Sequence, residues 1–150
     1  MCDLLAAGAF PPSPGTFQSR STQVDVNPMV ILVAEDHEDV RLAIWNILKA
    51  SGHTVLAAYD GEAALELSRS YPGTIDLLLS DIDMPRMGGL ELCQTIAAER
   101  PEIKVLIMSG GLQELEHVFM KEMPFLQKPF TSTTVLHSII ALLGPNQPLP

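Results

Sequence analysis

The sequence has few cysteines, few basic residues and no long apolar run. With two cysteines in 150 residues, Cys2 and Cys93, it has neither a disulfide framework nor a cysteine-based zinc site. Nine Lys and Arg stand against eighteen Asp and Glu, and the formal charge of −9 argues against direct binding to nucleic acid. No stretch approaches the ~18–20 apolar residues of a membrane span, and Asp3 stands where a signal peptide carries positive charge. We therefore expect a cytoplasmic protein.

Proline is concentrated at the two ends of the chain. Seven of the twelve prolines fall within 1–28 and 145–150, and the first of these segments also contains several Ser and Gly without a hydrophobic period. We expect a flexible N-terminal tail over 1–28 and a C-terminal tail over 145–150. One domain then remains over 29–144, and a hydrophobic content of 47% is enough to build its core. Cys93 lies within an apolar helical pattern and is expected to be a core thiol.

Short apolar runs alternate with helical patterns through this domain. Buried strands are expected over 30–34, 54–58, 75–80, 103–108 and 124–127. Helices are expected to follow them, beginning near residues 40, 61, 88, 112 and 132. Gly52 is expected to end the first of these helices as a left-handed residue, and Asp60 to cap the second. The strand starts are 21 to 28 residues apart, which leaves room for one crossover helix each and none for hairpins. The pattern predicts an α/β fold with a doubly wound, five-stranded parallel sheet covered by helices on both faces.

Polar residues appear where each of four apolar runs stops. They are Glu35 and Asp36, Asp81, Ser109 and Lys128. Because ligands of doubly wound sheets bind beyond the carboxyl ends of the strands, we expect these side chains to meet at one edge. Crowded carboxylates repel one another unless a cation joins them or one takes up a proton. A set of oxygen ligands without cysteine fits Mg²⁺, which retains several water molecules.

These residues and their neighbours resemble the receiver domain of two-component response regulators. The resemblance covers about 29–144 and rests on four motifs: Glu35-Asp36, the run 77–85 followed by Met87-Gly88-Gly89, Met108-Ser109-Gly110, and Lys128-Pro129-Phe130. Each motif alone is weak, but all four in this order are a specific signal. The resemblance implies a flavodoxin-like (βα)5 receiver fold with strand order 2-1-3-4-5 and a cis Lys128-Pro129 peptide.

The resemblance also implies a phosphoacceptor and a metal site. Asp81 would accept a phosphoryl group from a sensor histidine kinase or a histidine phosphotransfer protein. Mg²⁺ would be held by Asp36, the Asp81 carboxylate and the backbone carbonyl of Asp83, with Glu35 acting partly through water. The carboxylate of Asp83 would lie beside the route of the attacking water, and we expect it to alter the lifetime of the phosphorylated state.

Three further residues would complete the reaction and the switch. The resemblance implies that Lys128 pairs with the Asp81 carboxylate and then with a phosphoryl oxygen, while Ser109 donates a hydrogen bond to another. Ser109 would move toward the phosphoryl group, and an aromatic residue three positions before the lysine would turn into the vacated space. Phe125 holds that position and has no hydroxyl with which to stabilise its outward state.

A candidate docking surface lies on the first helix. Helical spacing places Val40, Ile44 and Leu48 toward the sheet and Leu42 and Trp45 on the outward side. The first helix is the place where a kinase or phosphotransfer protein docks in this family. Trp45 is therefore a candidate anchor for such a partner.

Two alternatives stay open at the level of sequence. The chain could be a pseudo-receiver, an interaction module that works without phosphorylation. Asp81-Ile82-Asp83 also forms the DxD pattern of haloacid-dehalogenase phosphatases, although those carry it on their first strand. As a receiver, the chain would be no enzyme beyond its own phosphorylation and dephosphorylation. With only six residues after Gly144, it would signal by contact with an unknown downstream protein or by phosphorelay.

Overall fold

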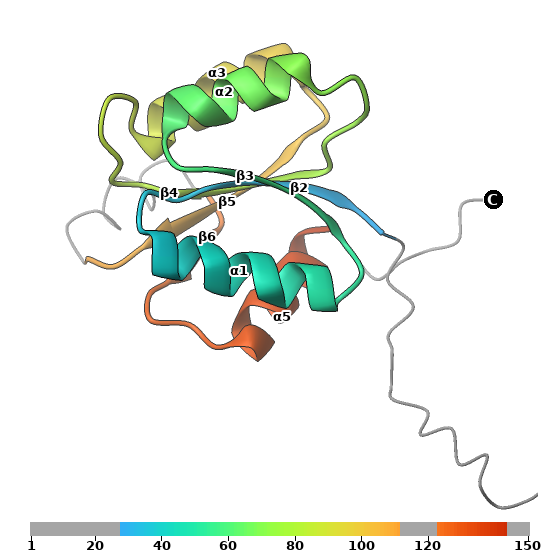
Figure 1. Ribbon diagram of the computed structural model, residues 1–150, viewed down its shortest axis with the longest axis vertical. Coiled ribbons are helices and arrows are strands. Elements are labelled where there is room, and N and C mark those ends of the chain that lie inside the picture. Colours follow the sequence, from blue (N-terminus) through green and yellow to red (C-terminus); the bar gives the residue numbers. More distant parts are fainter. Residues whose placement is uncertain (1–27, 112–122, 144–150) are drawn as a thin grey trace, which may run out of the picture.

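Helices lie on both faces of one sheet in the computed structural model, which describes residues 28–111 and 123–143 (Figure 1). The strands are β2 (Val30–Ala34), β3 (Thr54–Ala58), β4 (Leu77–Asp81), β5 (Lys104–Ser109) and β6 (Phe125–Gln127). The helices are α1 (Glu38–Ala50), α2 (Gly61–Ser70), α3 (Gly89–Glu99) and α5 (Ser132–Leu143).

All strand pairs in the five-stranded sheet are parallel, and the strand order is β3-β2-β4-β5-β6. This confirms the expected α/β fold and the order 2-1-3-4-5, counted from the first strand. Successive crossovers run from β2 outward to β3 and then back past β2 to β4. The carboxyl ends of β2 and β4 therefore lie side by side at the point where the strand order reverses, which is where doubly wound sheets bind their ligands.

The strands have apolar side chains on both faces because neighbouring residues of a strand point to opposite sides. Along β2, Ile31 and Val33 pack on the side of α1 and α5, whereas Leu32 and Ala34 pack on the side of α2 and α3. Cys93 is buried in the second of these layers, as its apolar surroundings in the sequence predict. Burial raises the pKa of its thiol to about 12, so it is an inert core residue.

The expected bounds agree closely for β2, β3 and α5 and differ for three strands, of which β6 begins at Phe125 instead of Pro124. The strand expected over 75–80 begins at Leu77, and the side chain of Asp76, just before it, accepts a hydrogen bond from the Val30 amide at 2.8 Å. That strand runs on to Asp81, which pairs with Met108, so the polar residue belongs to the strand. Likewise the strand expected over 103–108 is observed one residue later in the chain.

Local signals at the helix ends are also observed. Gly52, predicted as the left-handed residue that ends the first helix, has a φ of 90°. Asp60 caps α2 by accepting a hydrogen bond from the Ala63 amide at 2.7 Å. The helix expected over 112–121 and the tails expected over 1–28 and 145–150 lie outside the described residues, apart from Pro28. None of the described helices is long and apolar enough to cross a membrane.

Candidate functional site

An acidic cluster lies at the carboxyl ends of β2 and β4. Ligand atoms of Glu35, Asp36, His37 and Asp81 all lie within 4.8 Å of one another. Lys128, which follows β6, reaches the same place: its Nζ atom is 2.8 Å from Glu35 Oε2 and 3.3 Å from Asp81 Oδ1. The structure thus brings together the three acidic side chains and the lysine that the sequence placed at strand ends.

Glu35 is fully buried and held by protein donors on both carboxylate oxygens. Its Oε1 accepts a hydrogen bond from the His37 amide at 3.1 Å, and its Oε2 accepts one from Lys128 at 2.8 Å. Arg41 donates to the backbone carbonyl of Glu35 at 2.9 Å, which fixes the turn between β2 and α1. Glu35 is thereby the nearer counter-ion of Lys128, an arrangement that suits indirect contact with a metal.

Asp36 and Asp81 carry the negative charge that is less well compensated. Asp36 Oδ1 is buried and has no hydrogen-bond partner among the described residues, although the ring Nδ1 of His37 lies 3.2 Å away. Burial, followed by the charge of Glu35, raises the pKa of Asp81 to about 6, while Lys128 acts in the opposite direction. A buried carboxylate oxygen without a hydrogen-bond partner and a carboxyl group whose ionisation is opposed by burial are oxygen donors that fit a hard divalent cation.

Lys128 is the cation of the site. Burial lowers its pKa, but the hydrogen bond to Glu35 and the charge of Asp81 outweigh burial, so the net shift is upward and the ammonium is charged at neutral pH. Its backbone amide donates to the Ser109 carbonyl at 2.7 Å, which fastens the end of β6 to the end of β5. The Lys128-Pro129 peptide is cis, as the resemblance implied.

The residues expected to switch lie on β5 and β6. Ser109 is buried, and its hydroxyl donates to the Gly111 carbonyl at 3.3 Å. Phe125 is half-buried and packs against the apolar layer on the side of α2 and α3. Asp83 is exposed, two residues beyond the end of β4. The positions suit the expected roles, which stay predictions.

Leu42 and Trp45 lie outward on α1, as the helical spacing predicts. Their exposed fractions are 51% and 38%. The ammonium of Lys49, one turn further along, lies 5.7 Å from the centre of the Trp45 ring. Their role in docking stays a prediction.

His37 is a residue that the sequence analysis missed. The hydrogen bond to Glu35, followed by the charges of Asp36 and Glu35, raises its pKa, and 70% of its side chain is exposed. Its position in the sequence, directly after the acidic pair, could have marked it as a candidate site residue. Spacing alone could not show that its ring turns back toward those carboxylates.

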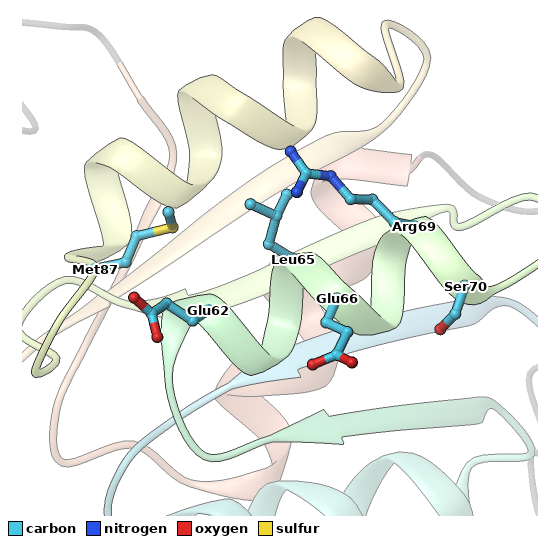
Figure 2. A pocket seen from close by; sticks show the side chains of 6 residues that line it. All are labelled: Glu62, Leu65, Glu66, Arg69, Ser70 and Met87. Atoms are coloured by element: carbon cyan, nitrogen blue, oxygen red, sulfur yellow. The ribbon is translucent and has the colours of Figure 1, made fainter.

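A separate hollow of about 640 Å³ lies over α2 (Figure 2). It is lined by Glu62, Leu65, Glu66, Arg69, Ser70 and Met87. These residues do not include any of the acidic cluster. The hollow is therefore a second surface feature and not the candidate site.

A parallel sheet of this order, with an acidic cluster and a lysine at its carboxyl edge, defines the class of receiver-type signalling domains. The chain belongs to the response regulator receiver domain family, whose sequence model matches residues 31–140. Among solved structures, the receiver domain of the hybrid histidine kinase CckA is 32% identical, with a TM-score of 0.65 over 76% of this chain and 98% of that one. A response regulator receiver domain protein from Clostridium thermocellum is 26% identical, with a TM-score of 0.69 over 77% of this chain and 94% of that one.

Curated relatives include both kinases and regulators. The sensor kinase CckA of Brucella abortus is 34% identical over 118 residues, which cover 75% of this chain and 12% of the kinase. The response regulator MprA of Mycobacterium ulcerans is 33% identical over 116 residues, covering 75% of this chain and 49% of that protein. The chain thus spans about half or less of the length of these relatives.

Proposed function

We propose that this chain accepts a phosphoryl group on Asp81 from a phosphohistidine of a sensor histidine kinase or a histidine phosphotransfer protein. The observation that carries the proposal is the buried Asp81 carboxyl, whose pKa is raised to about 6, with Lys128 3.3 Å away and two more acidic side chains beside it. Buried ionisable groups with a raised pKa and a nearby charge partner are typical of functional sites, whereas an ordinary ion pair on the surface does not require buried acidic groups.

In the proposed transfer, a bond forms between an Asp81 carboxylate oxygen and phosphorus while the phosphorus–nitrogen bond of the donor breaks. The donor histidine keeps the electron pair of that bond. Lys128 shifts from Glu35 and Asp81 toward a phosphoryl oxygen, which lowers the repulsion between the anionic acceptor and the anionic group. Burial at the strand end aligns the acceptor and keeps it in one place.

The residues that would hold a divalent cation, proposed to be Mg²⁺, are Asp36, the Asp81 carboxylate and the Asp83 backbone carbonyl, with Glu35 acting through water. The buried Asp36 oxygen without a hydrogen-bond partner supports this assignment. When bound, the cation supplies neutralisation of the charge that builds up on the transferring group. The chain's own part is to hold these oxygens near one another before the ion arrives.

Signalling would begin with Ser109. Its hydroxyl would leave the Gly111 carbonyl and donate to the phosphoryl group, and Phe125 would turn toward the space that it leaves. The exposed Leu42 and Trp45 of α1 would form the docking surface for the kinase or phosphotransfer protein. The signal would then pass to a downstream protein by contact or by phosphorelay, in the cytoplasm, with no enzymatic activity other than the domain's own phosphorylation and dephosphorylation.

The test is exposure of wild type and Asp81→Asn to acetyl phosphate and Mg²⁺, followed by intact-mass spectrometry. We expect wild type to gain one base-labile phosphoryl group and Asp81→Asn to stay unmodified. EDTA added before the donor should prevent the modification of wild type. An unmodified wild type would instead support the pseudo-receiver alternative. Continued release of phosphate from a phosphomonoester would support the phosphatase alternative.

A further inference from the structure

Arg86 adopts a backbone conformation that side chains avoid. In the segments 28–111 and 123–143, it is the one residue other than glycine with a positive φ, at 71°. This left-handed region is unfavourable for a residue with a β-carbon, and a long side chain occupies it when other contacts hold it there. Arg86 lies in the loop over 82–88 that joins the phosphoacceptor strand to α3.

Two carboxylates at the start of α2 face the Arg86 guanidinium. Its Nη1 atom is 3.6 Å from Asp60 Oδ2 and 3.8 Å from Glu62 Oε2. Asp60 is 3% exposed and uses its other oxygen, Oδ1, to cap α2 through the Ala63 amide. Arg86 therefore faces a buried carboxylate that is already fixed in position by the helix it caps.

The loop also touches α2 through its backbone. A β-carbon added to Gly61 would lie 2.6 Å from the Met87 carbonyl oxygen, so glycine is required for this approach. Figure 2 shows Glu62 on α2 pointing toward the part of the loop that carries Met87. The contacts of Arg86 and of Gly61 thus act on the same loop from the same helix.

The far end of the loop is joined to its own beginning. The Gly89 amide donates to the Ile82 carbonyl at 3.0 Å, and the Met87 amide donates to the Pro85 carbonyl at 2.9 Å. A β-carbon at Gly89 would collide with the Asp81 carbonyl. Between these anchors lies Asp83, whose backbone carbonyl is the proposed metal ligand.

We propose that Arg86 is a positioning residue: its ion pairs with Asp60 and Glu62 hold the 82–88 loop against α2, and thereby place the Asp83 carbonyl at the metal site. The proposal rests on the proposed function. It extends that function by making the N-terminus of α2 part of the machinery that sets metal affinity at Asp81. Arg86 itself touches neither the phosphoryl group nor the cation.

The test compares variants that separate charge from backbone strain. Arg86→Ala removes the charge and keeps the strain, Arg86→Gly removes both, and Arg86→Lys keeps the charge. Asp60→Asn keeps an oxygen that can cap α2 and removes the partner charge. Urea unfolding of each variant establishes that it folds before any other measurement.

Two readouts follow: the Kd for Mg²⁺ from calorimetry and, in the metal-free protein, the hydrogen-exchange rate of the Gly89 amide. We expect Arg86→Ala, Arg86→Gly and Asp60→Asn to raise both two- to fivefold, and Arg86→Lys to stay within twofold of wild type. Arg86→Ala combined with Asp60→Asn should be no worse than Arg86→Ala alone, because the ion pair between Arg86 and Asp60 is already absent from that variant.

Wild-type values in Arg86→Ala and Arg86→Gly would overturn the proposal, as would additive effects in the double variant. These outcomes are distinct from failure of the proposed function, which is the absence of a phosphoryl group on wild-type Asp81. The exchange rate is measured without metal or donor, so it tests the role of Arg86 even if Asp81 is never phosphorylated.

Discussion

Asp81 is a buried carboxyl whose ionisation is opposed by its surroundings. The folded state raises its pKa to about 6, compared with ~3.9 in an unfolded chain. The folded protein therefore binds this proton more tightly than the unfolded chain does. The stabilisation is fully present below pH ~4 and is lost as the pH rises through about 6.

The first prediction follows from this sign. At pH 7.5 without metal, Asp81→Asn should be more stable than wild type by about 1–3 kcal/mol, since one pKa unit corresponds to ~1.4 kcal/mol. At pH 4 the difference should nearly vanish, because wild-type Asp81 is then protonated. Urea unfolding at the two pH values measures it. The exposed Glu102→Gln is the control, and an equal gain in that variant would contradict the role of burial.

At the scale of elements, Arg100 joins the end of α3 to the end of α2. Its guanidinium donates to the Ser68 hydroxyl at 3.0 Å and to the carbonyls of Ser68, Tyr71 and Gly73 at 2.6, 2.8 and 2.9 Å. These carbonyls lie at the C-terminal end of α2 and in the turn after it, where a helix has no partners of its own and attracts positive charge.

The second prediction is that Arg100→Ala lowers the free energy of unfolding by about 2–4 kcal/mol, because charged hydrogen bonds are lost and partly buried carbonyls are left without donors. Arg69 provides a matched control on the same pair of helices. It pairs with Glu99 at 2.6 Å, but its side chain is 58% exposed, and Arg69→Ala should cost at most ~1 kcal/mol. Equal losses in urea unfolding would contradict this account.

The outward face of α1 yields the third prediction. If Leu42 and Trp45 form the docking surface, Trp45→Ala should slow phosphorylation by a kinase or phosphotransfer protein at least tenfold. This is the loss expected when an aromatic side chain that becomes buried in the complex is removed. Phosphorylation by acetyl phosphate should not change, because that donor needs no docking surface. Tyr59→Ala is the control, since Tyr59 is 60% exposed and lies outside α1. Equal slowing with both donors would rule out docking.

At the scale of the whole molecule, metal binding and folding are linked through the acidic cluster. The cluster exists only when β2 and β4 are paired, so an ion that binds it stabilises the folded chain. The fourth prediction is a gain of ~2.7 kcal/mol at free Mg²⁺ one hundred times its Kd. Thermal unfolding with Mg²⁺ and then with excess EDTA measures the gain and its reversal. Asp36→Asn should show little of it, and an undiminished gain would place the ion elsewhere.

Much of this protein could be read from local patterns. Five apolar runs separated by helical segments predicted the layers and the parallel sheet, and the resemblance to receiver domains implied the strand order. The glycine at 52 and the aspartate at 60 predicted the ends of two helices. The acidic residues and the lysine were placed at one edge because the carboxyl ends of parallel strands meet there. Periodicity, helix capping and strand ends depend on neighbours in the chain, which a sequence displays directly.

Contacts between distant segments needed the tertiary structure. Lys128 lies 93 positions from Glu35, and its nearer partner is Glu35 at 2.8 Å rather than Asp81 at 3.3 Å. The contact of the His37 ring with the acidic pair and the contact of Arg86 with Asp60 likewise could not be predicted from the sequence. Charge and residue type were visible in the sequence, but the choice among competing partners depends on differences of less than an ångström between packed elements, which only the assembled sheet and helices determine.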